Sequence, residues 1–224
     1  MHKLYTYLAI VLLAAISAVG VFVFSHSKRS VEPVASANIA LSEVTGSQVA
    51  GAATIKSNAQ LSMPISEGLS RVTKKPFGLY VNPAISPVDN DIFVGFHTGI
   101  DFEIDPSEQN TDVTITAACE GKVLFKEWAK GYGGVLVQSC KLDGEDVTVI
   151  YGHLKLESIA VSVGQTLKPT DKIGYLGQGN TRETDGRRKH LHFDIHKGTE
   201  INILGYAPAK EDLANWVDPI KYLQ

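Results

Sequence analysis

The chain has 224 residues, of which 44% are hydrophobic, and it carries 21 basic against 24 acidic side chains. Three of the basic side chains and no acidic one fall in the first 30 residues, so the remainder has 18 basic and 24 acidic groups, a net charge of −6. Domains that bind nucleic acid normally have an excess of positive charge. The composition therefore excludes nucleic acid as the expected partner.

The N-terminal segment is the first predicted element. Residues 4–24 are mostly apolar and contain no charged side chain, and about 20 such residues suffice to span a bilayer as a helix. The best small-residue cleavage site, Ala35-Ser36-Ala37, lies well beyond this span, whereas a secretory signal is cleaved close to a shorter apolar core. We therefore expect residues 1–27 to be an uncleaved transmembrane helix, with a cleaved signal peptide as the alternative.

Residues 28–75 are rich in Ser, Ala, Val and Asn and lack aromatic side chains. This composition predicts a linker or stalk. Leu61 to Ile65 is more apolar, and the sequence leaves open whether this part packs on the C-terminal domain. Residues 76–224, about 150 in number, are expected to form that domain, which is of ordinary size.

Short β-branched runs punctuated by Gly or Asp-Gly turns predict a mostly β, antiparallel domain. The runs are 113–116, 123–125, 135–137 and 147–150, and a further hairpin is expected within 161–177. Glu211 to Trp216 is the one segment of the domain with a convincing helical pattern. Cys119 and Cys140 fall near the ends of neighbouring strand candidates, so a disulfide and two buried thiols both remain open.

Two segments alternate between apolar and polar residues, as expected of strands with one buried face. His97 and Asp101 lie on the polar side of the first segment, and His190 and His192 lie on the polar side of the second. If the two strands lie side by side, His97, Asp101 and His192 can converge on one cation. Two imidazoles and one carboxylate suit zinc, and three protein ligands leave a fourth position open, as in catalytic zinc sites.

The motif His97-x-x-x-Asp101, followed by Tyr151-Gly152-His153-Leu154 and then His190-x-His192, resembles the lysostaphin-type zinc endopeptidases that cut peptide cross-links in bacterial cell walls. The resemblance covers about residues 76–224. Further stretches similar to this family occur in order at 96–102, 131–135, 163–165, 173–177 and 217–219. The resemblance therefore rests on several segments at family-like spacing rather than on one motif.

This resemblance implies an antiparallel β-sheet domain of the lysostaphin-type peptidase fold, with one catalytic zinc held by His97, Asp101 and His192. It also implies that His153 and His190 stand around the water and the scissile carbonyl as base and transition-state stabiliser, without deciding which does which. Peptidoglycan is the implied substrate, and the implied location of the domain is outside the cytoplasmic membrane, facing the wall.

The segment before His190 departs from the family pattern. Many relatives carry a Ser/Thr/Gly-rich loop ending in Gly-Pro, whereas this chain has Arg187-Arg188-Lys189. These charges either attract carboxylates of a stem peptide or belong to a solvated loop, and we favour the solvated loop. Asp194 is expected either to support a ligand or to be a plain surface carboxylate. His196 is expected to have no part in the site.

The sequence thus predicts a membrane-anchored zinc endopeptidase, single-pass in the cell membrane, that hydrolyses peptide bonds in peptidoglycan stem peptides or cross-bridges. The alternative is a catalytically silent or gated wall-binding regulator of another cell-wall hydrolase, with a regulatory protein as a further partner. Inactive relatives commonly lose one or more of the five site residues. All five are present here, which favours the enzyme.

Overall fold

The computed structural model describes residues 60–224, so the predicted anchor at residues 1–27 and most of the predicted linker lie outside the described residues. Within this part the fold is mostly β, and all paired strands are antiparallel, as predicted. Its helices are all too short or too polar to cross a bilayer. The strands are β1 (Tyr80–Val81), β2 (Gly95–His97), β3 (Gly99–Glu103), β4 (Thr114–Thr116), β5 (Gly121–Ala129), β6 (Gly133–Leu142), β7 (Glu145–Leu154), β8 (Thr166–Leu167), β9 (Lys172–Tyr175), β10 (His190–Lys197) and β11 (Tyr206–Ala207).

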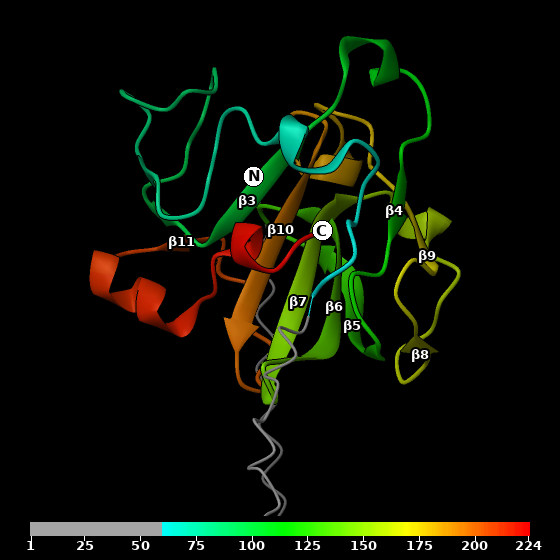
Figure 1. The fold of residues 1–224 in the computed structure, drawn as a ribbon. Coiled ribbons are helices and arrows are strands. Elements are labelled where there is room, and N and C mark those ends of the chain that lie inside the picture. The colour runs from blue at the N-terminus through cyan, green and yellow to red at the C-terminus, as the bar shows by residue number, and fades with distance from the viewer. Residues whose placement is uncertain (1–59) are drawn as a thin grey trace, which may run out of the picture. The chain divides into compact units, whose positions relative to one another are not determined.

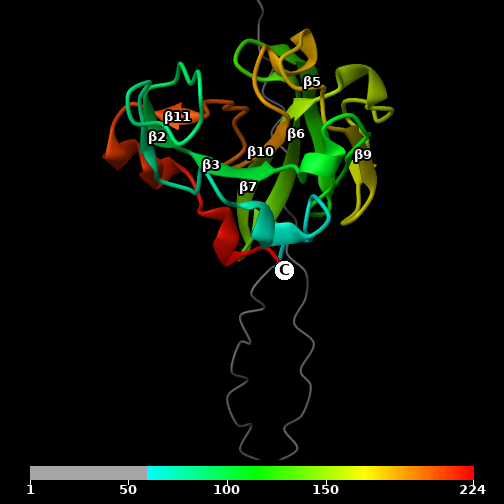
Figure 2. The same cartoon turned by 90° about the horizontal axis from the view of Figure 1, so that it is seen from above.

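A six-stranded sheet in the order β3-β10-β7-β6-β5-β8 forms the centre of the domain. A three-stranded sheet, β1-β2-β11, lies beyond the β3 edge, and the β4-β9 pair lies on the opposite side (Figures 1 and 2). The hairpin between β6 and β7 turns at Asp143 and Gly144, whose φ angles are +52° and +88°. Positive φ at both central residues is what a tight hairpin turn requires, and Asp-Gly is a favoured pair there.

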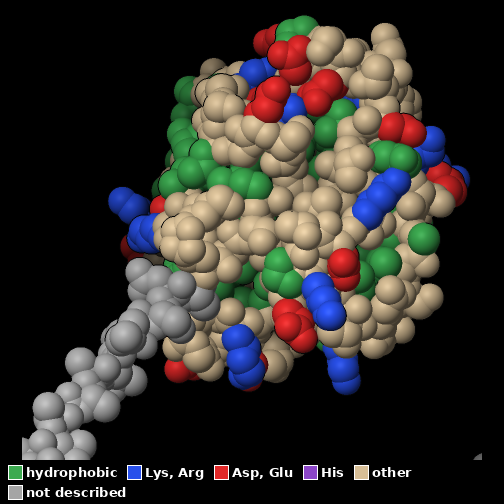
Figure 3. Space-filling view, turned by 45° about the vertical axis from the view of Figure 1, so that its right-hand side comes forward, with side chains coloured by type: hydrophobic (Ala, Val, Ile, Leu, Met, Phe, Trp, Pro, Cys, Tyr) green, Lys and Arg blue, Asp and Glu red, His purple; other side chains and the backbone are tan. Residues whose placement is uncertain are grey.

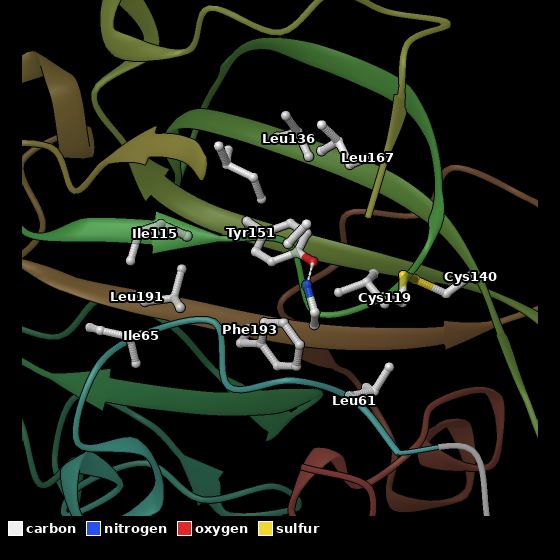
Figure 4. Packing of buried hydrophobic residues seen from close by; sticks show 14 of the residues in the cluster. Leu61, Ile65, Ile115, Cys119, Leu136, Cys140, Tyr151, Leu167, Leu191 and Phe193 are labelled. Atoms are coloured by element: carbon white, nitrogen blue, oxygen red, sulfur yellow. Dashed lines mark hydrogen bonds between the residues drawn. A yellow bond between two sulfur atoms is a disulfide. The ribbon is translucent and has the colours of Figure 1, made fainter. Parts of the chain in front are cut away.

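The main core is built on one face of the central sheet (Figure 4). Leu191 and Phe193 of β10 and Tyr151 of β7 are completely buried, as the alternating pattern predicts. The hydroxyl of Tyr151 donates to Gln138 Oε1 at 2.9 Å and accepts from the Ala118 amide at 2.8 Å, so its polar end is satisfied inside the core. Burial of these side chains fixes the faces of β7 and β10, and therefore fixes which residues of β10 point toward the site.

The segment around Leu61 packs on the domain, which answers the question that the sequence left open. Leu61 and Ile65 are 2% and 3% exposed and belong to the core. The Leu61 amide donates to Tyr222 O at 2.8 Å, and the Gln224 amide donates to Leu61 O at 3.1 Å. The packed structure therefore begins before the predicted boundary at residue 76, because a short apolar stretch covers an otherwise open edge of the core.

The predicted helix at Glu211–Trp216 corresponds to a 3-10 helix, η5 (Lys210–Asn215). Six residues are too few to stabilise an α-helix, and short runs commonly take the tighter 3-10 form. The other helices of the described residues are also 3-10: η1 (Gly68–Arg71), η2 (Pro106–Glu108), η3 (Leu156–Ser158), η4 (Arg182–Thr184) and η6 (Pro219–Lys221). On the face shown in Figure 3, acidic and basic side chains are intermingled over the surface.

Cys119 and Cys140 form a disulfide, which decides between the two predicted states of these residues. Their Cα atoms are 6.0 Å apart, an ordinary separation for a disulfide. Cys140 lies on β6 and Cys119 lies in the turn that leads into β5, so the bond ties neighbouring parts of the central sheet together.

Candidate metal centre

The pairing of β3 with β10 brings two of the three predicted ligands together. Asp101 and His192 are register partners in this pair. The sequence predicted His97 and Asp101 on one strand. His97 instead lies at the end of β2, because the chain passes from one sheet to the other at Thr98. Thr98 Oγ1 donates to Leu204 O at 2.8 Å, which holds the crossing in place.

His97, Asp101 and His192 lie close enough to hold one ion. His97 Nε2 is 3.1 Å from His192 Nδ1 and 3.2 Å from Asp101 Oδ1, and His192 Nδ1 is 2.9 Å from Asp101 Oδ1. Tetrahedral zinc with ligand bonds of about 2.0–2.1 Å separates its donors by about 3.3 Å. The three side chains are 0%, 1% and 3% exposed. Both the donor set and its spacing fit zinc.

Each of the two candidate ligand imidazoles is oriented by a hydrogen bond on its far side. His97 Nδ1 lies 3.2 Å from Pro76 O, and His192 Nε2 lies 2.7 Å from Asp194 Oδ2. Since a backbone carbonyl oxygen only accepts, His97 carries its proton on Nδ1 and presents the Nε2 lone pair to the centre. Asp194 acts in the same way on His192, whose Nδ1 faces the centre. Such outer partners fix both the tautomer and the ring orientation of a metal ligand.

His153 and His190, the two predicted catalytic residues, face each other beside the centre, with ring centroids 4.3 Å apart. His153 Nδ1 donates to Tyr132 O at 2.7 Å, and His190 Nδ1 donates to Arg188 O at 2.9 Å. Both rings therefore keep an unprotonated Nε2 when neutral. His190 Nε2 lies 3.3 Å from Asp101 Oδ2, which places it directly against the ligand set.

A β-bulge sets the position of His153. In the β6–β7 pair, Leu154 faces Gly134 and Gly152 faces Val135, so His153 has no partner across the ladder. Its φ angle is +62°, in the left-handed region that non-glycine residues seldom occupy. Bulges re-aim side chains and occur often next to active sites. Here the bulge turns the imidazole toward His190.

Burial and neighbouring charges shift the protonation of these groups. Burial lowers the pKa of the His153 imidazole well below its usual range, and the nearby His190 and His192 lower it further. Burial also lowers the pKa of His190, and Arg188 adds to this. His153 and His190 are therefore neutral at pH 7, as a proton acceptor must be.

Asp101 and His192 show the opposite behaviour, because their surroundings favour the charged form of each side chain. Burial opposes ionisation of Asp101, but the adjacent imidazoles of His190 and His97 and the Arg188 guanidinium hold its pKa well below the usual value. Burial would lower the pKa of His192, but the carboxylates of Asp194 and Asp101 raise it to about 10. Without a cation, His192 is therefore protonated and lies between two carboxylates. A metal ion has to displace that proton to bind at Nδ1.

Asp194 and Tyr132 complete the surroundings of His192. Asp194 is completely buried, which excludes the predicted alternative of a plain surface carboxylate. The Tyr132 hydroxyl lies 3.4 Å from Asp194 Oδ2, and its ring meets His192 edge-on at 5.3 Å. Tyr132 was not predicted as a site residue, although the family-like stretch 131–135 contains it. The absence of a side chain at Gly152 makes room for it, because a Cβ there would lie 2.4 Å from the Tyr132 ring.

A cavity of about 390 Å³ opens onto the imidazoles of His153, His190 and His192. One wall carries a buried ion pair between Lys75 and Asp91, and Lys75 Nζ also donates to the Tyr206 hydroxyl at 2.8 Å. Sequence reasoning missed this ion pair, because nothing in the pattern around Lys75 distinguishes it from an exposed lysine. The site is thus an open cavity with the predicted ligand His192 in its wall, and the buried His97 and Asp101 lie next to His192.

The three cations before β10 have three different environments, so the favoured solvated loop is wrong for two of them. Lys189 is 4% exposed and donates to the carbonyls of Glu108 at 2.9 Å and Thr111 at 2.5 Å. Arg188 binds the carboxylate of Asp101. Arg187 lines the cavity, with its guanidinium 5.6 Å from the centre of the Phe93 ring.

His196 was expected to have no part in the site. Its ring packs edge-on against Trp216, with 4.7 Å between the ring centroids.

Known families and solved structures contain relatives of this chain. The model of Peptidase family M23 matches residues 95–203. No curated protein matches the chain. Csd3 from Helicobacter pylori shares 20% identity at a TM-score of 0.46, over 75% of this chain and 37% of that chain. LytU shares 28% identity at 0.45, over 66% and 81%. A zinc-containing peptidase from Vibrio cholerae shares 22% at 0.41, over 61% and 36%. The match with Csd3 thus spans little more than a third of that protein.

Proposed function

We propose, from the premise that residues 95–203 belong to peptidase family M23, that this protein is a zinc-dependent endopeptidase that hydrolyses peptide bonds in peptidoglycan stem peptides or cross-bridges. Membership of this family confirms the predicted relationship with the lysostaphin-type peptidases, implies a metallopeptidase and suggests a peptidoglycan hydrolase. The finer parts of the proposal are the single zinc, the residues that hold it, the anchor and the location.

One observation carries the proposal. Three donors of the type and spacing that zinc requires lie together, and one of them, His192, lines a cavity beside two neutral imidazoles with unprotonated Nε2 atoms. We assign His97, Asp101 and His192 as the zinc ligands and His153 and His190 as the catalytic residues. His153 and His190 line the same cavity, and the Nδ1 atom of each is bound to a carbonyl oxygen. A group of purely structural histidines would not need this arrangement.

Zinc held by the three ligands would polarise the scissile carbonyl as a Lewis acid and make water more acidic. The side chains provide the rest. One of His153 and His190 takes the proton of the attacking water at Nε2 and later passes it to the leaving amine. The other, once protonated at Nε2, stabilises the negative charge that develops on the carbonyl oxygen. Their Nδ1–H bonds to Tyr132 O and Arg188 O hold both rings in position through these proton transfers.

The location of the enzyme follows from its substrate. We propose that residues 1–27 anchor the chain in the cell membrane as a single-pass helix and that residues 76–224 face the wall on the extracytoplasmic side. The Cys119–Cys140 disulfide supports this location, because disulfides persist outside the reducing cytosol. Peptidoglycan and the membrane are then the partners, together with a regulatory protein in the gated alternative.

The test is digestion of purified peptidoglycan by the full chain in detergent, with zinc content measured in the same samples and released fragments identified by mass spectrometry. Release of cleaved stem peptides by the wild-type protein, but not by His190→Ala with its zinc retained, is the expected result. A protein that binds one zinc and releases nothing would instead support the alternative, a silent or gated wall-binding regulator. A protein that binds no zinc would refute the proposed site.

A further inference from the structure

Arg188 joins the proposed zinc site to the loop that distinguishes this chain from the family pattern. Its Nη2 donates to Asp101 Oδ2 at 2.7 Å, and its Nε donates to Glu103 Oε2 at 2.9 Å and Oε1 at 3.1 Å. Nη2 also contacts Glu103 Oε1. The side chains of Arg188, Asp101 and Glu103 are 20%, 1% and 13% exposed, so the contacts are largely shielded from water.

The two oxygens of Asp101 face different neighbours. Oδ1 faces the nitrogens of the proposed ligands, 2.9 Å from His192 Nδ1 and 3.2 Å from His97 Nε2. Oδ2 accepts from Arg188 and lies 3.3 Å from His190 Nε2. The planar guanidinium contacts two carboxylates at once, a geometry that lysine cannot reproduce. Glu103 therefore fixes the guanidinium, and the guanidinium fixes the plane of the Asp101 carboxylate.

We propose that Arg188 is a positioning residue for zinc. Its guanidinium holds Asp101 as a one-oxygen ligand and keeps the second oxygen of that carboxylate away from the metal. The inference rests on the proposed zinc site. The inference goes beyond the zinc site because it assigns a role to the loop at 187–189, where this chain departs from the family pattern. Outer partners of this kind commonly contribute a factor of roughly 10–100 to metal affinity.

Charge and positioning have opposite effects on zinc affinity, and this makes the role measurable. Arg188 carries a positive charge close to the cation, so charge repulsion alone would make zinc bind more tightly once the charge is removed. Loss of positioning leaves the Asp101 carboxylate free to rotate away from the ligand nitrogens, and makes zinc bind more weakly. A weaker affinity in a charge-removing variant is therefore a result that only positioning explains.

The experiment measures the zinc dissociation constant of the full chain by competition with a chromophoric chelator. We expect Arg188→Gln to weaken zinc binding by roughly 10–100-fold. Arg188→Lys, which keeps the charge but not the two-carboxylate contact, should also weaken it, by a smaller factor. Arg187→Gln is the matched control, because it removes the same charge from the adjacent residue, whose Nε donates only to the Asp185 carbonyl at 3.2 Å. Its zinc affinity should stay unchanged or increase slightly.

Cobalt supplies a readout that is independent of activity. If Arg188 keeps Oδ2 away from the metal, the Arg188→Gln protein loaded with Co²⁺ should show a changed visible spectrum, since coordination geometry determines that spectrum. Arg187→Gln should keep the wild-type spectrum. Circular dichroism of the metal-free variants checks the fold, and Glu103→Gln, which loosens the guanidinium without touching Asp101, replaces Arg188→Gln if that variant does not fold.

The outcomes separate this inference from the proposed function. Wild-type protein without measurable zinc affinity would refute the zinc site and this inference with it. Wild-type protein that binds zinc, together with equal or tighter binding by folded Arg188→Gln, or by Glu103→Gln in its place, would refute the positioning role and leave the proposed function intact.

Discussion

The close approach of β3 to β10 at Gly99 gives the sharpest test of how the site is held. Gly99 is the register partner of Asp194, the residue that orients His192. A Cβ at position 99 would lie 1.9 Å from Asp194 Oδ1 and 2.2 Å from Phe193 O. Ordinary contacts begin at 3.4 Å, so the carboxylate would have to move by 1.5 Å and the carbonyl by 1.2 Å.

We expect Gly99→Ala to destabilise the domain and to weaken zinc binding together. Overpacking costs about 1–3 kcal/mol, and one disturbed ladder hydrogen bond adds about 1 kcal/mol, which gives roughly 2–4 kcal/mol. At about 2–4 °C per kcal/mol for a domain of this size, Tm should fall by roughly 4–16 °C. Displacement of Asp194 releases the His192 ring, so the zinc dissociation constant should rise by about 10–100-fold.

Gly198→Ala is the matched control. Gly198 follows directly after β10, its φ angle is +85°, and within residues 60–224 no atom beyond its two chain neighbours lies within 4 Å of the position a Cβ would take. It should lose only the roughly 1–2 kcal/mol of a left-handed alanine and keep its zinc affinity. Thermal unfolding and chelator competition measure both quantities. If Gly99→Ala melted no lower than Gly198→Ala and bound zinc as wild type does, the described packing of β3 on β10 would be refuted.

Four further predictions concern the site and its framework. His192→Ala should abolish zinc retention because it removes a proposed ligand, whereas His153→Ala should keep zinc and lose peptidoglycan turnover. Metal analysis together with digestion of peptidoglycan checks both expectations. Normal metal content and normal cleavage in both variants would show the site assignment to be wrong. Zinc binding at pH 7.5 should release about one proton, since the pKa of His192 is raised to about 10 in the metal-free protein; calorimetry in two buffers of different ionisation enthalpy measures this. Because of the same raised pKa, the charged form of His192 stabilises the metal-free fold. This contribution is fully present below about pH 6.5 and is lost as the pH rises through about 10. A Tm of the metal-free protein that rises over this interval would contradict the raised pKa. Replacing Cys119 and Cys140 by Ser should cost about 3 kcal/mol, because the disulfide closes a loop of 21 residues; thermal unfolding of both forms measures the loss, and zinc affinity should not change.

The strands were predictable, and so was the side of the strand on which Asp101 and His192 each lie, because both depend on local alternation. The buried rows of β7 and β10 repeat every second residue, so the apolar pattern determines which side chains face the core. Once β3 and β10 pair, their register places Asp101 opposite His192. The switch of sheets at Thr98 was not predicted, because a chain that continues in extended form shows the same alternation on both sides of the crossing.

The groups that the charged side chains contact could not be predicted from the sequence. Arg187, Arg188 and Lys189 are adjacent and of one charge, yet one lines the cavity, one binds a proposed ligand and one is buried against carbonyls. The partners of Arg188 and Lys189 come from segments more than 75 residues away along the chain. No pattern confined to neighbouring residues carries that information.

The placement of His153 shows how a small irregularity determines the chemistry. In a regular ladder, neighbouring side chains point to opposite faces of the sheet, so a shift of one residue would turn the imidazole away from the cavity. The bulge gives β7 one residue more than β6 at this point, and a φ angle of +62° at His153 accommodates it. Left-handed backbone in a residue other than glycine costs about 1–2 kcal/mol, which the Nδ1–H bond to Tyr132 O helps to offset. Strain of this kind persists only where the surroundings hold it in place, and here it turns the His153 imidazole toward His190 beside the proposed metal site.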